Sequence, residues 1–315
     1  MFDHVLRHAR SAALLGAIVL FASSAGAQSA AALLERGKVL MDGIVACGNC
    51  HVARGPQGQP LFDKGLSGGM VFDEPPFRAV ASNITPDAAT GIGKWTDAQL
   101  AKAIREGIRP DGSVIGPPMP MEFYRHLSDS DLAAIVAYLR TQPAVANAPG
   151  KSVYRIPLPP SYGPPITAPV PLPPASDKLR YGEYLANIGH CMDCHTPRSA
   201  EGRLLTVQLG AGGMPFPGPW GVSVARNLTP HESGLKGWSD AEIARAIRTG
   251  VRRDGTGLKP PMAFRLVRQY RRRRHGGAGR LPKLVEAAGF RGQVSADPAR
   301  GRATAYSAAM NEVLV

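Results

Sequence analysis

Two five-residue stretches decide the fold: Cys47-Gly48-Asn49-Cys50-His51 and, 144 positions later, Cys191-Met192-Asp193-Cys194-His195. In each stretch two thiols stand three residues apart and an imidazole follows at once. Together they contain all four cysteines of the chain. Cysteines this close within one turn are poor disulfide partners, so the spacing indicates another use for the thiols.

The similarity extends outward from these stretches at offsets of 143 or 144 residues. A repeat of this length, with one residue of slippage, predicts two homologous units in one chain. The matching segments are Asn83-Ile84-Thr85-Pro86 with Asn227-Leu228-Thr229-Pro230, Trp95 with Trp238, Ala103-Ile104-Arg105 with Ala246-Ile247-Arg248, and Pro117-Pro118-Met119 with Pro260-Pro261-Met262.

The 315 residues divide into five predicted segments. The first has a positive start, an apolar stretch too short to span a bilayer and the small-residue pattern Ala25-Gly26-Ala27, and so predicts an export signal cleaved after Ala27. A proline-rich segment between the units predicts an extended spacer. The segments are the signal at 1–27, the first unit at 28–142, the spacer at 143–176, the second unit at 177–264, and an arginine-rich tail at 265–315.

The predicted secondary structure is helical, and the predicted fold class is all-α. Thr96 with Gln99, and Ser239 with Glu242, are capping-box pairs that begin helices. Ser128 begins another helix, whose apolar residues form one stripe. That helix has no recognisable counterpart in the second unit, which is therefore expected to be incomplete. The stripe consists of Leu132, Ile135, Val136 and Leu139.

Cys-x-x-Cys-His is the attachment pattern of c-type haem. The two thiols add to the haem vinyl groups, and the following histidine reaches the iron. The sequence therefore predicts two covalently bound haem c groups. A thioredoxin-like thiol pair is disfavoured because no strand leads into either site, and a Cys₄ zinc site leaves both histidines unexplained. The attachment residues are Cys47, Cys50 and His51 in the first unit and Cys191, Cys194 and His195 in the second.

The other axial position of each iron is predicted to hold a methionine. Met119 and Met262 are the candidates, because they occupy equivalent places after Pro-Pro. Met70 and Met214 also match one another and are the main rivals, while Met121 competes in the first unit alone. An iron closed by imidazole on one side and thioether on the other has no vacant position for a substrate. The expected role is electron transfer, not catalysis.

These residues resemble the class I cytochrome c fold, and the two-unit arrangement resembles the cytochrome c subunits of periplasmic alcohol, sugar-acid and aldehyde dehydrogenases. The resemblance implies two tandem cytochrome c domains, with His51 and His195 as proximal ligands and Met119 and Met262 as distal ones. It also implies that Gly37 lets the N-terminal helix of the first unit cross the C-terminal helix closely. Gly182 and Tyr138 complete the residues that the resemblance assigns to such crossings.

The resemblance implies a periplasmic protein that takes single electrons from a dehydrogenase and passes them to a quinone-linked complex or a terminal oxidase. Peripheral association with the membrane is kept as an option. Two other functions are weighed. A dihaem peroxidase needs one open iron, whereas both units present Pro-Pro-Met. A haem-based sensor needs an output module, and none is recognised.

The formal charge of +13 is concentrated at the C-terminus. The tail holds 11 basic and 3 acidic residues, whereas residues 28–264 hold 24 and 20. The body therefore has no charge pattern for nucleic acid, which is not an expected partner. Because the repeat stops abruptly after Phe264, a disrupted reading frame is the favoured interpretation of the tail. A basic arm for an acidic partner or membrane, and a divergent folded end, are the alternatives.

Overall fold

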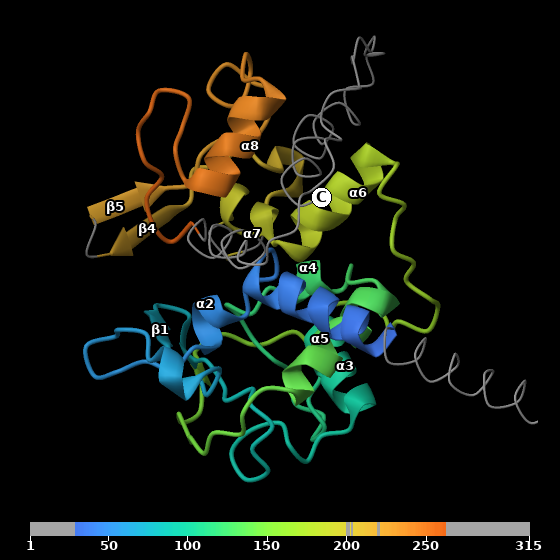
Figure 1. Cartoon of the computed structure of the whole chain (residues 1–315). Coiled ribbons are helices and arrows are strands. Elements are labelled where there is room, and N and C mark those ends of the chain that lie inside the picture. The colour runs from blue at the N-terminus through green and yellow to red at the C-terminus, as the bar shows by residue number, and fades with distance from the viewer. Residues whose placement is uncertain (1–28, 200–201, 203, 219–220, 263–315) are drawn as a thin grey trace, which may run out of the picture.

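The computed structural model describes residues 29–199, 202, 204–218 and 221–262, and it has two units packed one on the other (Figure 1). The first unit lies below and the second above in this view, with α6 beside their boundary. The N-terminal helix covers residues 29–42. The other elements are α2 (Gly48–His51), the 3₁₀ turn η1 (Phe62–Lys64), β1 (Val71–Glu74), β2 (Phe77–Val80), α3 (Asp97–Glu106), α4 (Met121–Tyr124), α5 (Asp129–Arg140), β3 (Val153–Tyr154), α6 (Lys178–Ile188), α7 (Cys191–His195), η2 (Thr206–Gln208), β4 (Pro215–Gly218), β5 (Gly221–Val224) and α8 (Asp240–Thr249).

The helices begin where their capping residues predict. Thr96 and Ser239 each form a complete capping box with the residue three positions later, which satisfies free backbone N–H groups at the starts of α3 and α8. Both helices end at a glycine in the left-handed conformation, Gly107 and Gly250. Ser128 caps α5, whose predicted apolar stripe is buried as expected.

The all-α prediction is wrong, because both units contain an antiparallel hairpin. β1 pairs with β2 from Val71↔Val80 to Glu74↔Phe77, and β4 pairs with β5 in the equivalent place. The strands are four residues long, too short for their alternation to stand out from the surrounding loops. Long loops still have to satisfy their backbone polar groups, and pairing into hairpins does this between the attachment helices and the Asn-x-Thr-Pro loops.

The proline-rich segment lies against the first unit. β3, at Val153–Tyr154, adds to the edge of β2, so the first sheet has the order β1-β2-β3. Farther along, Tyr162 donates from its hydroxyl to the carbonyl of Ile115 at 2.8 Å. The segment thus has specific hydrogen bonds to the first unit, although its prolines cannot donate from the backbone.

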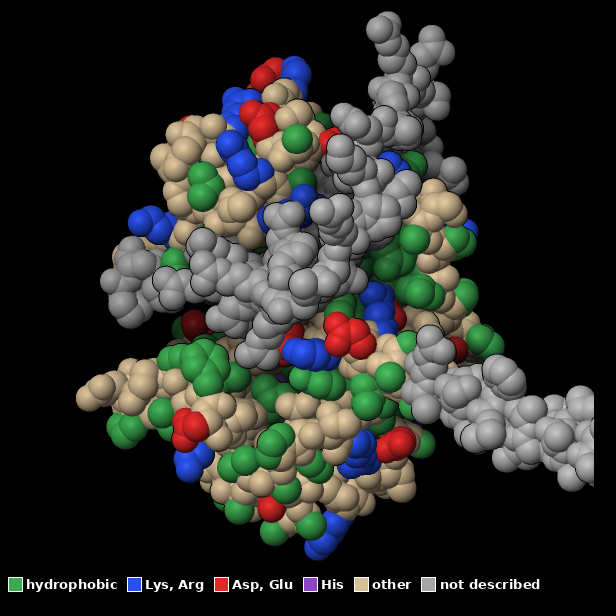
Figure 2. Space-filling model, viewed as in Figure 1, with side chains coloured by type: hydrophobic (Ala, Val, Ile, Leu, Met, Phe, Trp, Pro, Cys, Tyr) green, Lys and Arg blue, Asp and Glu red, His purple; other side chains and the backbone are tan. Residues whose placement is uncertain are grey.

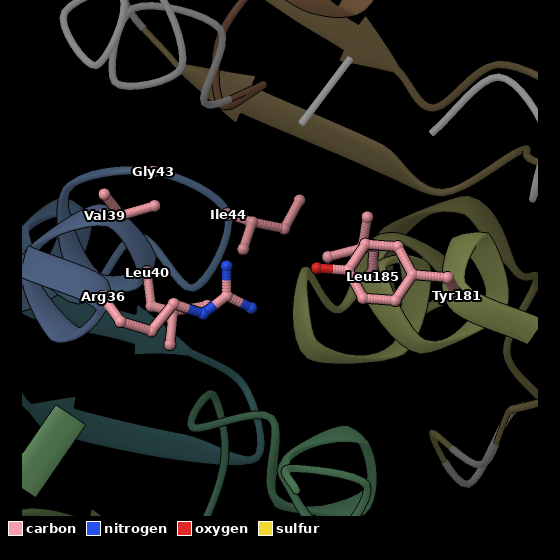
Figure 3. A pocket seen from close by; sticks show the side chains of 7 residues that line it. All are labelled: Arg36, Val39, Leu40, Gly43, Ile44, Tyr181 and Leu185. Carbon is pink, nitrogen blue, oxygen red and sulfur yellow. The ribbon is translucent and has the colours of Figure 1, made fainter. Parts of the chain in front are cut away.

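One hydrophobic core joins the two units. It contains residues of the N-terminal helix and α5, such as Leu40 and Ile135, and residues of α6, such as Leu185 and Ile188. A pocket at the same boundary is lined from both sides (Figure 3). Its lining residues are Arg36, Val39, Leu40, Gly43 and Ile44 from the first unit and Tyr181 and Leu185 from the second.

A buried carboxylate links three helices at this boundary. Asp131 of α5 is 1% exposed and accepts two hydrogen bonds from the guanidinium of Arg36, at 2.8 and 2.7 Å. The hydroxyl of Tyr184 on α6 donates to the same carboxylate at 2.6 Å. Because a buried charge needs such partners, this cluster, the Arg36–Asp131–Tyr184 cluster, connects the first unit to the second.

Gly37 lies where the N-terminal helix crosses α5. A Cβ at this position would stand 2.0 Å from the carbonyl oxygen of Ala134 and 2.7 Å from the Cβ of Tyr138. Only glycine permits so close a crossing, as the family resemblance implied. Gly182 is buried within α6.

Several predictions fall on residues outside the described part of the chain. The signal at 1–27, Phe264 and the tail at 265–315 are among them, and the boundaries of the five segments stay predictions. In the described ranges, none of the helices has the length and apolar character needed to cross a membrane.

Candidate haem-binding sites

Both Cys-x-x-Cys-His stretches form a short helical turn. α2 begins after Cys47 and ends at His51, and α7 runs from Cys191 to His195 (Figure 1). The residue before each stretch, Ala46 or His190, has a positive φ of 52° or 43°, so the two turns start from the same backbone conformation. Within the described part of the chain none of the four cysteines forms a disulfide, so both thiol pairs can attach a haem.

The histidine of each site is held by the same backbone contact. His51 Nδ1 lies 2.8 Å from the carbonyl oxygen of Ser82, and His195 Nδ1 lies 2.7 Å from that of Arg226. The Asn-x-Thr-Pro loops that follow these carbonyls are closed by their own asparagine, since Asn83 and Asn227 accept from the backbone N–H two residues on. With Nδ1 used as a donor, Nε2 is the nitrogen left to bind a metal.

Burial sets the protonation of these groups. It lowers the pKa of His51 and His195 and so favours the neutral imidazole that can bind iron. Burial also raises the pKa of Cys50 to about 11, against a lowering by the charge of Arg54. The pKa of Cys194 rises to about 12 through burial and then through the charge of Asp193. Each thiol thus meets the positive charge of an arginine, Arg54 or Arg198, and Cys194 also meets the negative charge of Asp193.

The methionine candidates lie in two different settings. Met119 is partly buried and packs against the core to which Cys47 also contributes, and Met262 is partly buried at the end of the described chain. The bonds Pro117–Pro118 and Pro260–Pro261 before them are both cis. Met121 is 1% exposed in α4 and belongs to the core.

The rival methionines stand at the start of the hairpins. The carbonyls of Met70 and Met214 accept from Ala81 and Ala225, at 2.8 and 2.9 Å. The sulfur of Met70 is 3.4 Å from a guanidinium nitrogen of Arg54. The backbone of each rival methionine therefore pairs with the far end of its hairpin, and the sulfur of Met70 also contacts Arg54.

Two aromatic side chains that the sequence did not single out, Tyr124 and His190, meet where the two units pack together. Tyr124 of α4 is buried, and its hydroxyl donates to the carbonyl of Val45 at 3.0 Å. Its ring meets that of His190 edge to face, with centroids 6.0 Å apart. The segments that precede the two attachment turns therefore face each other across the boundary. A signal for this contact was missing, because Tyr124 and His190 come from different units.

The residues of both sites fit a c-type haem. Each combines two cysteines that are not in a disulfide, on one helical turn, with a partly buried imidazole that uses Nδ1 on a backbone carbonyl. Among the described residues, no group of three or more histidine, cysteine and acidic side chains is arranged to hold a metal ion by itself. The arrangement thus favours a covalently attached porphyrin over the zinc alternative.

Comparison with known proteins supports this chemistry. The family model described as cytochrome c matches residues 34–143. A diheme cytochrome c-type protein of Cereibacter sphaeroides is 31% identical over 218 residues, which cover 66% of this chain and 70% of that protein. These 218 residues are more than either predicted unit contains, so the similarity extends beyond one unit.

Subunits of dehydrogenases are similar as well. The cytochrome c subunit of a quinone alcohol dehydrogenase from Gluconobacter oxydans is 33% identical over 76% of this chain and 52% of its own length. The cytochrome subunit of a fructose dehydrogenase from Gluconobacter japonicus is 33% identical over 65% of this chain and 42% of its own length. The chain spans about half the length of these curated relatives.

Proposed function

The chain belongs to the cytochrome c family, and we propose that it is a dihaem carrier that passes single electrons from a periplasmic dehydrogenase to the respiratory chain. A cytochrome c domain implies covalently bound haem c. The proposal of two haems rests on the equivalence of the sites. Both histidines use Nδ1 on a backbone carbonyl, which leaves Nε2 for iron.

When bound, haem iron gains and loses one electron, and this is the chemistry that the group supplies. Four residues of the chain would hold the two irons. His51 and His195 would bind them through Nε2, and Met119 and Met262 would bind them through their sulfur atoms. Met119 is favoured over Met70 because the sulfur of Met70 lies against Arg54, whereas Met119 packs against the same core as Cys47.

The proposed donor is a dehydrogenase, because several relatives are named as cytochrome subunits of such enzymes. The proposed acceptor is a quinone-linked complex or a terminal oxidase. A periplasmic location follows from the export signal predicted at residues 1–27. Figure 2 shows that Lys, Arg, Asp and Glu side chains are intermixed on the visible face, without the basic patch that nucleic acid requires.

The test is the haem content and coordination of the exported protein. Intact mass should show two covalent haems, and Cys191→Ala with Cys194→Ala should remove one. Carbon monoxide should bind neither ferrous iron in the wild type, but should bind the first iron in Met119→Ala. Met121→Leu is the matched control and should leave the iron closed. A mass without two haems, or ready binding of carbon monoxide to both irons, would contradict the proposal.

A further inference from the structure

An arginine holds each attachment turn by the same contact. Arg54 donates from Nη2 to the carbonyl oxygen of Asn49 at 2.7 Å, and Arg198 donates from Nη2 to that of Asp193 at 3.4 Å. The two arginines are 144 residues apart, as are the two acceptors. The repeat therefore places one guanidinium against each Cys-x-x-Cys-His turn.

The charge of this guanidinium is balanced in the second unit only. Arg198 also forms an ion pair with the carboxylate of Asp193. At the first site the equivalent side chain is the neutral Asn49, and Arg54 reaches Met70 instead. Arg54 Nε is buried without a hydrogen-bond partner, and no carboxylate in the described residues forms an ion pair with Arg54. The first site thus carries one more unit of positive charge.

Charge beside an iron shifts its redox equilibrium. The ferric state has one more positive charge than the ferrous state, so a nearby cation favours reduction and a nearby carboxylate favours oxidation. The effect is largest for groups that solvent screens poorly, as with Arg54 Nε. An unbalanced Arg54 should therefore raise the potential of the first site above that of the second.

We propose that the difference between Asn49 and Asp193 sets the order of the two potentials, so that electrons enter at the second unit and leave from the first. This inference depends on the proposed function, in which both sites hold haem iron. In the internal step one electron leaves the second iron, which becomes ferric, and reduces the first iron to the ferrous state. No bond is made or broken, and no proton has to move.

Other charges near the sites are more exposed. Arg226, whose carbonyl accepts from His195, replaces the neutral Ser82, but the residue is exposed, so solvent and salt screen its charge. Burial raises the pKa of the Cys47 thiol and the carboxylate of Asp42 raises it further, but Asp42 forms an ion pair with Lys38 at 2.7 Å, which balances its charge. The pair at Arg198 and the lone Arg54 are the charges that contact the turns directly.

The test is an optical redox titration of the full-length holoprotein at neutral pH, which resolves two one-electron steps. Asp193→Asn should raise the lower of the two reduction potentials and leave the higher one unchanged. Asn49→Asp should lower the higher reduction potential and leave the lower one unchanged. The difference between the two potentials should be smaller in each variant than in the wild type, and smallest in the double variant.

A matched control is Glu232→Gln, which removes the carboxylate of an exposed ion pair with Lys236 in the same unit. It should move neither step. The inference is overturned if Asp193→Asn leaves both steps unchanged or raises the upper one, or if Asn49→Asp does not lower the upper step. The variants are near-isosteric, and their intact mass reports two haems independently, so failure of the potentials is distinguishable from failure of the dihaem function.

Discussion

The two units share their local geometry but differ in how they are closed. Their attachment turns, histidine contacts, hairpins and capping boxes match residue by residue. The first unit is closed by α5, which crosses the N-terminal helix at Gly37. In the described part of the second unit, buried side chains come mainly from α6, whose Tyr184, Leu185 and Ile188 belong to the core shared with the first unit.

The difference teaches that a repeated motif copies hydrogen bonds but not packing. The copied contacts join segments that both units contain, such as each attachment turn and the carbonyl before its Asn-x-Thr-Pro loop. Burial depends on what covers each helix, and α6 is covered by the first unit. The second site is therefore expected to depend on the first for its stability, while the first does not depend on the second to the same extent.

The largest expected effect on stability is in the first unit, where the N-terminal helix crosses α5 at Gly37. In Gly37→Val the new Cβ would clash with the carbonyl oxygen of Ala134, 2.0 Å away. We expect the free energy of unfolding to fall by about 4 kcal/mol or more. Denaturant unfolding of the holoprotein, followed by far-UV circular dichroism and haem absorption, measures it. Gly257→Ala is the control, because its nearest neighbouring atom is 4.0 Å away. Equal stabilities of the two variants would refute the close crossing.

The next effect tests the dependence of the second unit on the first. Arg36→Met leaves the buried carboxylate of Asp131 with fewer partners, and we expect a loss of about 3 kcal/mol. Because Tyr184 bonds to the same carboxylate, the second haem should be released at a lower denaturant concentration than in the wild type.

The control is Arg155→Met, which breaks an ion pair whose two side chains are 49% and 60% exposed. Exposed pairs contribute about 1 kcal/mol or less, so this variant should resemble the wild type. If Arg36→Met weakens only the first unit, the cluster does not connect the units.

The sequence predicted what depends on short motifs. Cys-x-x-Cys-His predicts both sites, and the pairs at Thr96 and Ser239 predicted the starts of α3 and α8, which the structure confirms. Both rest on residues within one turn of each other, where a pattern determines the local hydrogen bonds. The roles of Met119 and Met262 stay predictions, because axial ligation depends on a group attached after synthesis.

What the sequence missed depends on contacts between distant residues. The hairpins have strands of four residues, so the loops read as irregular. The meeting of Tyr124 with His190, and of Asp131 with Tyr184, joins residues 66 and 53 positions apart in different units. No periodicity marks such pairs, and the position of a buried carboxylate has to be read from the structure.

A smaller effect concerns pH, at a position where the units differ. Burial lowers the pKa of His190 to about 4, whereas the first unit has Ala46 there. The unfolded imidazole binds a proton near pH 6.5 and the folded one does not, so stability present above pH 6.5 is lost as the pH falls toward 4. Between pH 7 and pH 4 the wild type should therefore lose about 2 kcal/mol more stability than His190→Asn. Each pKa unit corresponds to about 1.4 kcal/mol, and partial exposure of His190 reduces the effect.

Thermal unfolding of the holoprotein between pH 7 and pH 4 measures this. Asparagine tolerates the positive φ, so the variant should retain its backbone. His51 and His195 also have lowered pKa values, so both proteins should lose some stability in acid. Ala46→Asn is the control in the first unit, and it should leave the slope with pH unchanged. An unchanged slope in His190→Asn as well would mean that this imidazole does not titrate on unfolding.

The smallest effect compares the two capping boxes, where the units are most alike. Thr96 accepts from the backbone of Gln99 at 3.2 Å, and Ser239 accepts from that of Glu242 at 3.3 Å. Replacing either cap with alanine should cost about 1 kcal/mol, and replacing it with glycine only a few tenths, because glycine leaves the N–H groups open to water. Denaturant midpoints of the four holoprotein variants measure these costs. If Ser239→Ala costs less than Thr96→Ala by more than about 0.5 kcal/mol, then even a motif copied with its hydrogen bonds depends on the unit around it, since sites without shared partners should contribute independently.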